Sequence, residues 1–124
     1  MIDSIIKKYV GTVDEQMDTF QIENKAFFEI GVEDDWFYIH EIFVKSDFRN
    51  QGIAKYNLKL IIERAYFYGY RFFEIDVVTD NEEVFPNEEL KNFYINIFSN
   101  VSSFNRSETI QESDGYFNLK FYYN

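Results

Sequence analysis

Apolar residues gather into two neighbouring runs in the first half of the chain. Residues 26–32 and 36–44 are rich in aromatic and β-branched side chains, and the polar turn 33–35 separates them. This pattern predicts two strands. Because the second run is almost continuously apolar, we expect a central strand that is covered on both faces. Residues 2–10 predict a short helix ahead of them.

The next apolar pattern has helical spacing and ends at Gly69, a residue type that commonly terminates helices. The apolar face of this helix consists of Ala54, Leu58, Ile61, Ile62, Ala65 and Tyr68. Residues 72–78 then alternate apolar and acidic positions, which predicts a further strand. A polar loop at 79–86 follows this strand.

The last third of the chain predicts a helix and a terminal hairpin. Asn87 is a good N-cap, and the apolar stripe of the helix that follows is Leu90, Phe93, Tyr94 and Ile97. Residues 109–112 and 116–123 flank a turn at 113–115 and predict two paired strands. The order of elements favours a single α/β (α+β) domain over residues 1–124, with a mixed sheet.

Composition excludes several classes of chemistry. The 124 residues contain no cysteine and one histidine, so disulfides, thiolate metal sites, a cysteine nucleophile and a multi-histidine metal centre are ruled out. We expect no metal. With no long apolar segment and no pattern typical of a signal peptide, we expect a cytoplasmic protein that does not enter a membrane.

Charge is unevenly distributed along the chain. The formal net charge is −10, and this acidity argues against binding to nucleic acid. Basic residues nevertheless dominate between residues 45 and 71, where an anion could bind. They are Lys45, Arg49, Lys55, Lys59, Arg64 and Arg71.

The segment between the second predicted strand and the helix that follows it carries the most informative motif. An apolar strand ends at Val44, the chain turns through Arg49-Asn50-Gln51-Gly52-Ile53-Ala54, and a helix begins. Such a turn directs successive backbone N–H groups and the positive end of the helix dipole at one point, which suits a phosphate or pyrophosphate. Gly52 lets the backbone approach such a ligand. The motif is neither a P-loop nor a dinucleotide-binding glycine pattern.

Residues 44–54 resemble the central motif of the GNAT superfamily of N-acetyltransferases, a valine-ended strand followed by [Arg/Gln]-x-x-Gly-x-[Gly/Ala]. The segment from Asn87 to Tyr94 resembles the family's asparagine-to-tyrosine helix, although Asn81 also remains a candidate for that asparagine. The resemblance covers about residues 36–98. It implies a mixed, mostly antiparallel central sheet flanked by helices, with a shortened N-terminal region, and it implies acetyl-CoA as the cofactor.

The resemblance also implies roles for individual residues. It gives Tyr94 as the acid that protonates the departing thiolate, the Ile42 N–H as the donor to the thioester carbonyl, and His40 as the candidate base. Strand alternation would put His40 on the same face as Ile42 and Val44, with Glu41 opposite. The residues expected to bind the cofactor are Ile42, Phe43, Val44, Arg49, Asn50, Gln51, Gly52, Ile53, Ala54, Lys55, Asn87 and Tyr94.

The leading interpretation is an N-acetyltransferase that moves an acetyl group from acetyl-CoA to a primary amine by direct attack on the thioester. The acidic chain favours a cationic small molecule or a lysine side chain as the acceptor. Two alternatives stay open: a catalytically silent binding protein with this fold, and an acidic inhibitor that mimics nucleic acid. Apolar strands near the C-terminus also suggest pairing between two copies as a homodimer.

Overall fold

The computed structural model describes residues 2–77, 87–101, 104–111 and 117–124. Their helices are α1 (Ile2–Tyr9), the short 3-10 helix η1 (Ser46–Phe48), α2 (Ile53–Phe67) and α3 (Asn87–Ser99). Their strands are β1 (Gln16–Ile22), β2 (Ala26–Glu33), β3 (Trp36–Val44), β4 (Phe72–Val77), β5 (Phe104–Gln111) and β6 (Phe117–Tyr123). The predicted loop at 79–86 and the predicted turn at 113–115 lie outside the described residues.

The strands form one six-stranded sheet in the order β1-β2-β3-β4-β6-β5. Only the central pair, β3 and β4, is parallel, and α2 makes the crossover between them. All other neighbours are antiparallel. The prediction of a mixed, mostly antiparallel sheet with flanking helices is therefore confirmed.

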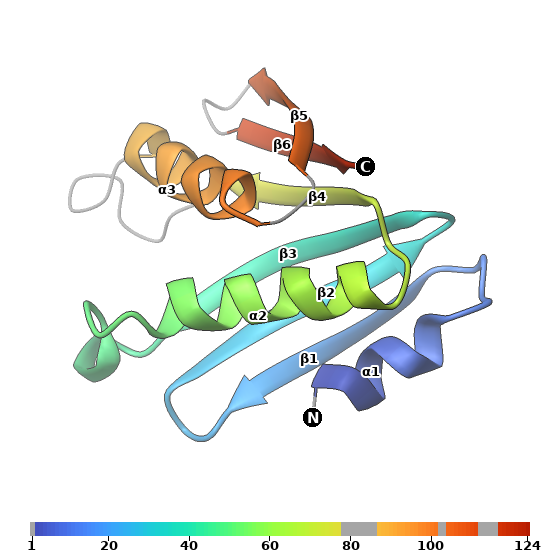
Figure 1. Ribbon diagram of the computed structural model, residues 1–124. Coiled ribbons are helices and arrows are strands. Elements are labelled where there is room, and N and C mark those ends of the chain that lie inside the picture. Colours follow the sequence, from blue (N-terminus) through green and yellow to red (C-terminus); the bar gives the residue numbers. More distant parts are fainter. Residues whose placement is uncertain (1, 78–86, 102–103, 112–116) are drawn as a thin grey trace.

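The three α-helices lie against the same face of the sheet (Figure 1). We call this the helix-covered face and the other the open face. On β3, Phe37 and Ile39 are buried on the helix-covered face, whereas Trp36 and Tyr38 are only half-buried on the open face. The expectation that this strand is covered on both faces is therefore wrong. Its outward positions carry aromatic rings, and this hides the alternation in the sequence.

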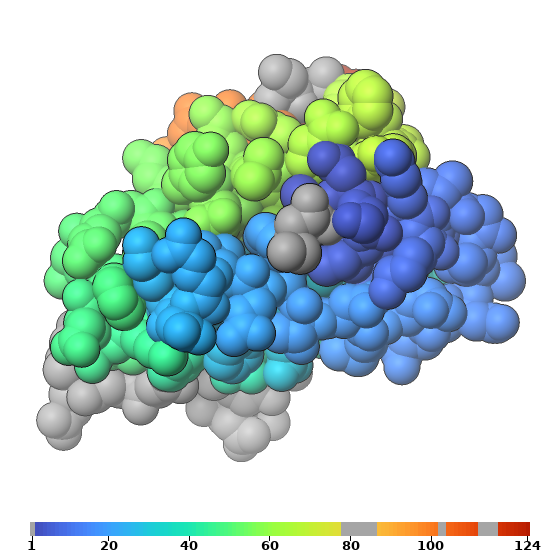
Figure 2. Space-filling view, turned by 90° about the horizontal axis from the view of Figure 1, so that it is seen from below, coloured from blue at the N-terminus to red at the C-terminus, as the bar shows by residue number. Residues whose placement is uncertain are grey.

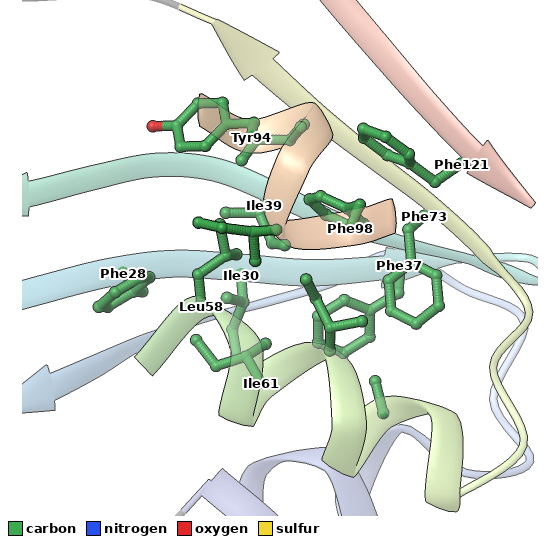
Figure 3. Packing of buried hydrophobic residues seen from close by; sticks show 14 of the residues in the cluster. Phe28, Ile30, Phe37, Ile39, Leu58, Ile61, Phe73, Tyr94, Phe98 and Phe121 are labelled. Carbon is green, nitrogen blue, oxygen red and sulfur yellow. The ribbon is translucent and has the colours of Figure 1, made fainter. Parts of the chain in front are cut away.

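Aromatic and aliphatic side chains fill the space between helices and sheet (Figure 3). The rings of Phe98 on α3 and Phe121 on β6 stack with centroids 3.9 Å apart. Phe73 on β4 contacts Phe98 edge-on and lies beside Phe37 on β3. The core is continuous across the sheet, so α2 and α3 hold the central strands from one side.

The two edges of the sheet differ from the sequence-based prediction. The apolar pattern does not reveal β1, because Phe20 is its only buried residue. The strand predicted at residues 109–112 is β5, which begins earlier than expected, at Phe104. Edge strands bury little, so they lack an alternating pattern. At the first edge, α1 and β1 are in contact (blue in Figure 2) and α2 lies next to α1.

None of the helices in the described part of the chain is both long and apolar enough to cross a bilayer.

Candidate functional site

The central parallel strands separate at one end of the sheet. Pairing between β3 and β4 extends from Trp36 opposite Phe72 to Ile39 opposite Ile75. From there β3 continues to Val44 alongside β2, and no described strand pairs with its other edge. On the side of β4, residues 40–44 therefore pair with no strand in the described part of the chain.

The main-chain groups of Ile42 and Val44 point toward this gap. The Lys45 N–H donates to the Lys25 carbonyl on the β2 side, at 2.9 Å. In an antiparallel pair, hydrogen-bonded and non-hydrogen-bonded positions alternate along the strand. Ile42 and Val44 thus direct their N–H and C=O groups away from β2. This is the orientation that the predicted contacts to an extended ligand require.

A β-bulge changes which face each predicted residue occupies. On β2, Glu29 lies opposite Glu41 and Ile30 opposite Ile39, so His40 is an extra residue in β3. Ile42 pairs with the buried Phe28 and packs on the helix-covered face. The His40 ring instead stacks on Tyr38 on the open face, with centroids 5.4 Å apart.

The prediction that His40 shares a face with Ile42 is therefore wrong. The bulge breaks the strict alternation on which that prediction rested. Glu41 lies on the open face, as its partner Glu29 does. It is opposite Ile42, as predicted, but the prediction that it lies opposite His40 is wrong, because the bulge puts both residues on the open face.

The turn after β3 is shaped by two residues with left-handed backbone conformations. Asn50 has φ 63° and Gly52 has φ 77°. Open space surrounds Gly52, because a Cβ placed there would meet no atom within 4 Å. The glycine therefore serves the backbone conformation rather than a close approach to the protein's own atoms. The Arg49 Nε donates to the Val44 carbonyl at 3.0 Å and ties the turn to the end of β3.

The backbone N–H groups of this turn have no acceptor within the described residues. The first N–H of α2 that finds a backbone partner is that of Tyr56, which donates to the Gly52 carbonyl at 2.9 Å. No side chain caps the helix at Gly52. The six N–H groups of residues 50–55 thus remain available at the positive end of a 15-residue helix. Such a set of donors suits an anion.

Positive side chains and a groove adjoin this turn. Lys45, Arg49 and Lys55 are exposed around it, and Lys59 follows one turn along α2. Lys55 and Lys59 line a cavity of about 390 Å³ between α2 and α3, which Asn96, Ile97 and Asn100 of α3 complete. A second cavity, of about 410 Å³, lies at the far end of α2 and contains none of the predicted site residues.

Tyr94 on α3 is held in the hydrophobic core. It is 5% exposed, and burial raises the pKa of its phenol above the usual value. Its hydroxyl has no hydrogen-bond partner among the described residues. In that part of the chain, no side-chain oxygen is completely buried and also without a hydrogen-bond partner. Figure 3 shows this oxygen pointing away from the other labelled side chains. The phenol is therefore protonated at neutral pH, and burial makes it a weaker acid than an exposed tyrosine.

The open face near the bulge carries a row of polar groups, among them Glu74 and Asp76 of β4. Burial raises the pKa of Glu74 on β4. The Lys120 ammonium, 3.9 Å from the Glu74 carboxylate, acts in the opposite direction and lowers this pKa, as does nearby His40. Asp76 accepts a hydrogen bond from Asn118 at 2.9 Å. The acidic positions of the alternating strand 72–78 were the signal for this row.

The other predicted residues are more scattered. The Phe43 ring stacks on Phe27, with centroids 5.4 Å apart. Asn87 is the first residue of α3, and the competing Asn81 lies outside the described residues. Among the residues that the structure describes, no group of acidic or histidine side chains could hold a metal ion.

Comparison with known proteins gives a family match. The profile of the acetyltransferase (GNAT) family matches residues 6–85. No curated protein matches the sequence.

Solved acetyltransferases have the same fold at low sequence identity. One is an N-acetyltransferase from Thermoplasma acidophilum in complex with coenzyme A, at 13% identity, 98% coverage of this chain, 67% of that chain and a TM-score of 0.60. Another is the ribosomal-protein-S18-alanine N-acetyltransferase from Escherichia coli, at 18% identity, 93% and 73% coverage and a TM-score of 0.53. A third is the spermidine N-acetyltransferase from Vibrio cholerae, at 9% identity, 97% and 71% coverage and a TM-score of 0.53.

Proposed function

The chain belongs to the acetyltransferase (GNAT) family, and on that premise we propose that it is an acetyl-CoA-dependent N-acetyltransferase. The observation that carries this proposal is the set of N–H groups at residues 50–55, which have no acceptor in the part of the chain that the structure describes and lie beside the end of the β3–β4 pairing. A pyrophosphate needs several converging donors and a positive environment. The turn provides both, with Arg49 and Lys55 next to the donors.

The residues that would hold acetyl-CoA lie along the end of β3 and in the turn that follows it. The backbone from Asn50 to Lys55 would take the pyrophosphate. The main-chain groups of Ile42 and Val44 would bind the extended arm as an added strand binds a sheet edge. The groove that Lys55 and Lys59 line lies beside this path and is wide enough to receive part of the cofactor.

Acetyl-CoA supplies an acetyl group that is activated as a thioester. In the transfer, the amine nitrogen bonds to the carbonyl carbon, the carbon–sulfur bond breaks, the amine loses a proton and the thiolate gains one. The Ile42 N–H would donate to the carbonyl oxygen as negative charge develops there. Tyr94, whose phenol is protonated at neutral pH, would donate its proton to the thiolate.

The proton of the attacking amine needs an acceptor. His40 is the base that we propose, now on the open face rather than beside Ile42. Its neighbour Glu74 would help to hold a cationic amine there, because a half-buried carboxylate attracts a cation more strongly than a solvated one. We therefore propose a primary amine on a cationic small molecule or on a lysine side chain as the acceptor. A chain without cysteine also suits the reducing cytoplasm, where we place this activity.

Binding of coenzyme A tests the proposal first. At a concentration of a hundred times Kd, coenzyme A should stabilise the fold by about 2.7 kcal/mol, which differential scanning calorimetry can measure. Arg49→Glu should abolish most of this shift, whereas Lys7→Glu on α1 makes the same charge change at a distant position and should leave it intact. An unchanged melting temperature at saturating coenzyme A would refute the proposal and favour the acidic inhibitor.

Turnover is tested separately. Acetyl-CoA mixed with the protein and a panel of polyamines and lysine peptides should release free thiol, which a chromogenic disulfide reports. Binding of coenzyme A without thiol release for any amine would favour the catalytically silent binding protein.

A further inference from the structure

The strand β5 leaves one backbone edge free. It pairs with β6 on one side, and no described residue pairs with it on the other. All its residues after Phe104 are exposed, and the apolar Ile110 is 43% exposed. No proline interrupts its sequence, and its one bulge lies near its start, between Phe104 and Arg106. Residues 106–111 are thus a regular strand, and along one edge its N–H and C=O groups have no strand partner among the described residues.

Two opposite charges lie on the same face of this strand, on either side of Ser107. Arg106 lies opposite Tyr122 and Glu108 opposite Lys120, so both are on the open face. The Arg106 guanidinium lies 4.2 Å from the centre of the Tyr122 ring, and Glu108 accepts a hydrogen bond from the Tyr122 hydroxyl at 3.1 Å. Tyr122 therefore holds both side chains beside the free edge, where the Arg106 guanidinium also lies 3.8 Å from the Glu108 carboxylate of the same strand.

We propose that β5 pairs antiparallel with β5 of a second copy, about a twofold axis at Ser107, which makes one continuous sheet of two subunits. For the open faces of both copies to lie on the same side, the axis must pass through a residue position. At Ser107 it puts Arg106 opposite Glu108 of the second copy, and the symmetry produces this attractive pair twice.

The neighbouring registers lack this complementarity. An axis at Glu108 would put two like charges directly opposite each other, and an axis at Thr109 would put Glu108 opposite Ile110. The edge strand β1 has no such pair either, because Asp18 is its only charged residue. The helix α1 also lies against β1 (Figure 2). Charge therefore selects both the strand and the register.

A single cysteine tests the register directly, because the chain has no cysteine of its own. Directly opposite residues in an antiparallel pair have Cα atoms about 4.5–5.5 Å apart, which is within the range of a disulfide. Under mild oxidation, Ser107→Cys should form a covalent dimer. The matched control is Gln21→Cys on the exposed edge of β1, which should remain monomeric on a denaturing gel. Equal cross-linking of the two variants would overturn the proposal.

Charge exchange tests the attraction between the copies by sedimentation velocity over a range of protein concentrations. Arg106→Glu and Glu108→Arg should each raise the dimer dissociation constant by roughly tenfold, since each turns two attractive cross-strand pairs into repulsive ones. The double variant restores both pairs and should recover most of the loss. The control Glu89→Arg on α3 makes the same charge change away from the edge and should leave the dissociation constant unchanged.

Circular dichroism of each variant separates weaker pairing from unfolding. A protein that stays monomeric at all concentrations, or a double variant no better than the single ones, would refute the β5 interface. These results are independent of the acetyltransferase activity, because none of the altered residues belongs to the proposed site.

Discussion

Replacement of Gly52 by alanine tests the proposed role of the turn most directly. Gly52 has φ 77°, and a Cβ there would meet no atom within 4 Å. The cost is therefore conformational rather than steric. A left-handed conformation costs an L-residue about 1–2 kcal/mol, and reduced freedom of the unfolded chain offsets about 0.4–1 kcal/mol of this. A net loss of about 1 kcal/mol in the free energy of unfolding remains, which corresponds to roughly 4 °C in melting temperature.

Gly11→Ala is a matched control. Gly11 has φ 84° and equally open surroundings, so it should lose a similar amount of stability. It lines the cavity at the far end of α2, a helix of 15 residues that is about 22 Å long. Relaxation of the backbone at Gly52 would scatter the N–H groups of residues 50–55, whereas relaxation at Gly11 would not.

The assay is isothermal titration of coenzyme A into the wild-type protein and the two variants. Gly52→Ala should raise the dissociation constant at least tenfold, and Gly11→Ala should leave it within twofold of wild type. Gly52→Asn should fall between wild type and Gly52→Ala, because asparagine tolerates the left-handed region better, as Asn50 already does here. If Gly52→Ala loses stability but binds coenzyme A as the wild type does, the turn does not form the pyrophosphate site.

Three further predictions concern titratable groups. Tyr94→Phe should lower kcat in the thiol-release assay by roughly a hundredfold and leave the stability almost unchanged. Tyr123→Phe should instead lower the free energy of unfolding by about 1–2 kcal/mol in thermal unfolding, because the Tyr123 hydroxyl donates a buried hydrogen bond. Burial raises the pKa of Glu74, so the ionised form of this side chain destabilises the fold. Glu74→Gln should therefore melt at a higher temperature than wild type at pH 7.5. This difference in melting temperature should vanish below the usual pKa of 4.5, where the carboxyl is protonated in both the folded and the unfolded chain. Burial also raises the pKa of Asp18, but hydrogen bonds from a tyrosine and a lysine lower it by more. Asp18→Asn should therefore be less stable by about 0.5–1 kcal/mol at pH 7, and the difference should disappear as the pH falls through that lowered pKa.

The interior of the fold could be predicted because burial leaves a pattern in the sequence. Strand β3 has the predicted limits of residues 36–44, and β4 and α2 lie within two residues of their expected limits. The two edges could not be predicted in the same way. In β1 only Phe20 is buried, and β5 is almost entirely exposed, so neither strand shows an alternation of apolar and polar residues. Backbone pairing stabilises such strands, and it leaves no mark on side-chain type.

The site shows the same division. The turn at residues 49–54 follows from its glycine, its basic residues and the helix after it, all of which are local in the sequence. The row around Glu74 could be inferred only in part. The alternating acids of residues 72–78 are visible in the sequence, but the members of the row come from β3, β4 and β6 and meet only across the sheet. Their register depends on long-range pairing rather than on neighbouring residues.

One extra residue in β3 connects these observations. A bulge bends its strand and increases the local twist. Pairing with β4 ends at Ile39, directly before the bulge at His40. The bulge therefore accounts for both features of the proposed site: beyond it, the edge of β3 with Ile42 is free to bind a ligand strand, and at it, the imidazole turns to the open face. A regular strand would keep His40 and Ile42 on one face and extend the pairing with β4, which would close the gap. The residue that defeats the simple alternation rule is thus the one that separates the proposed cofactor side of the site from the proposed acceptor side.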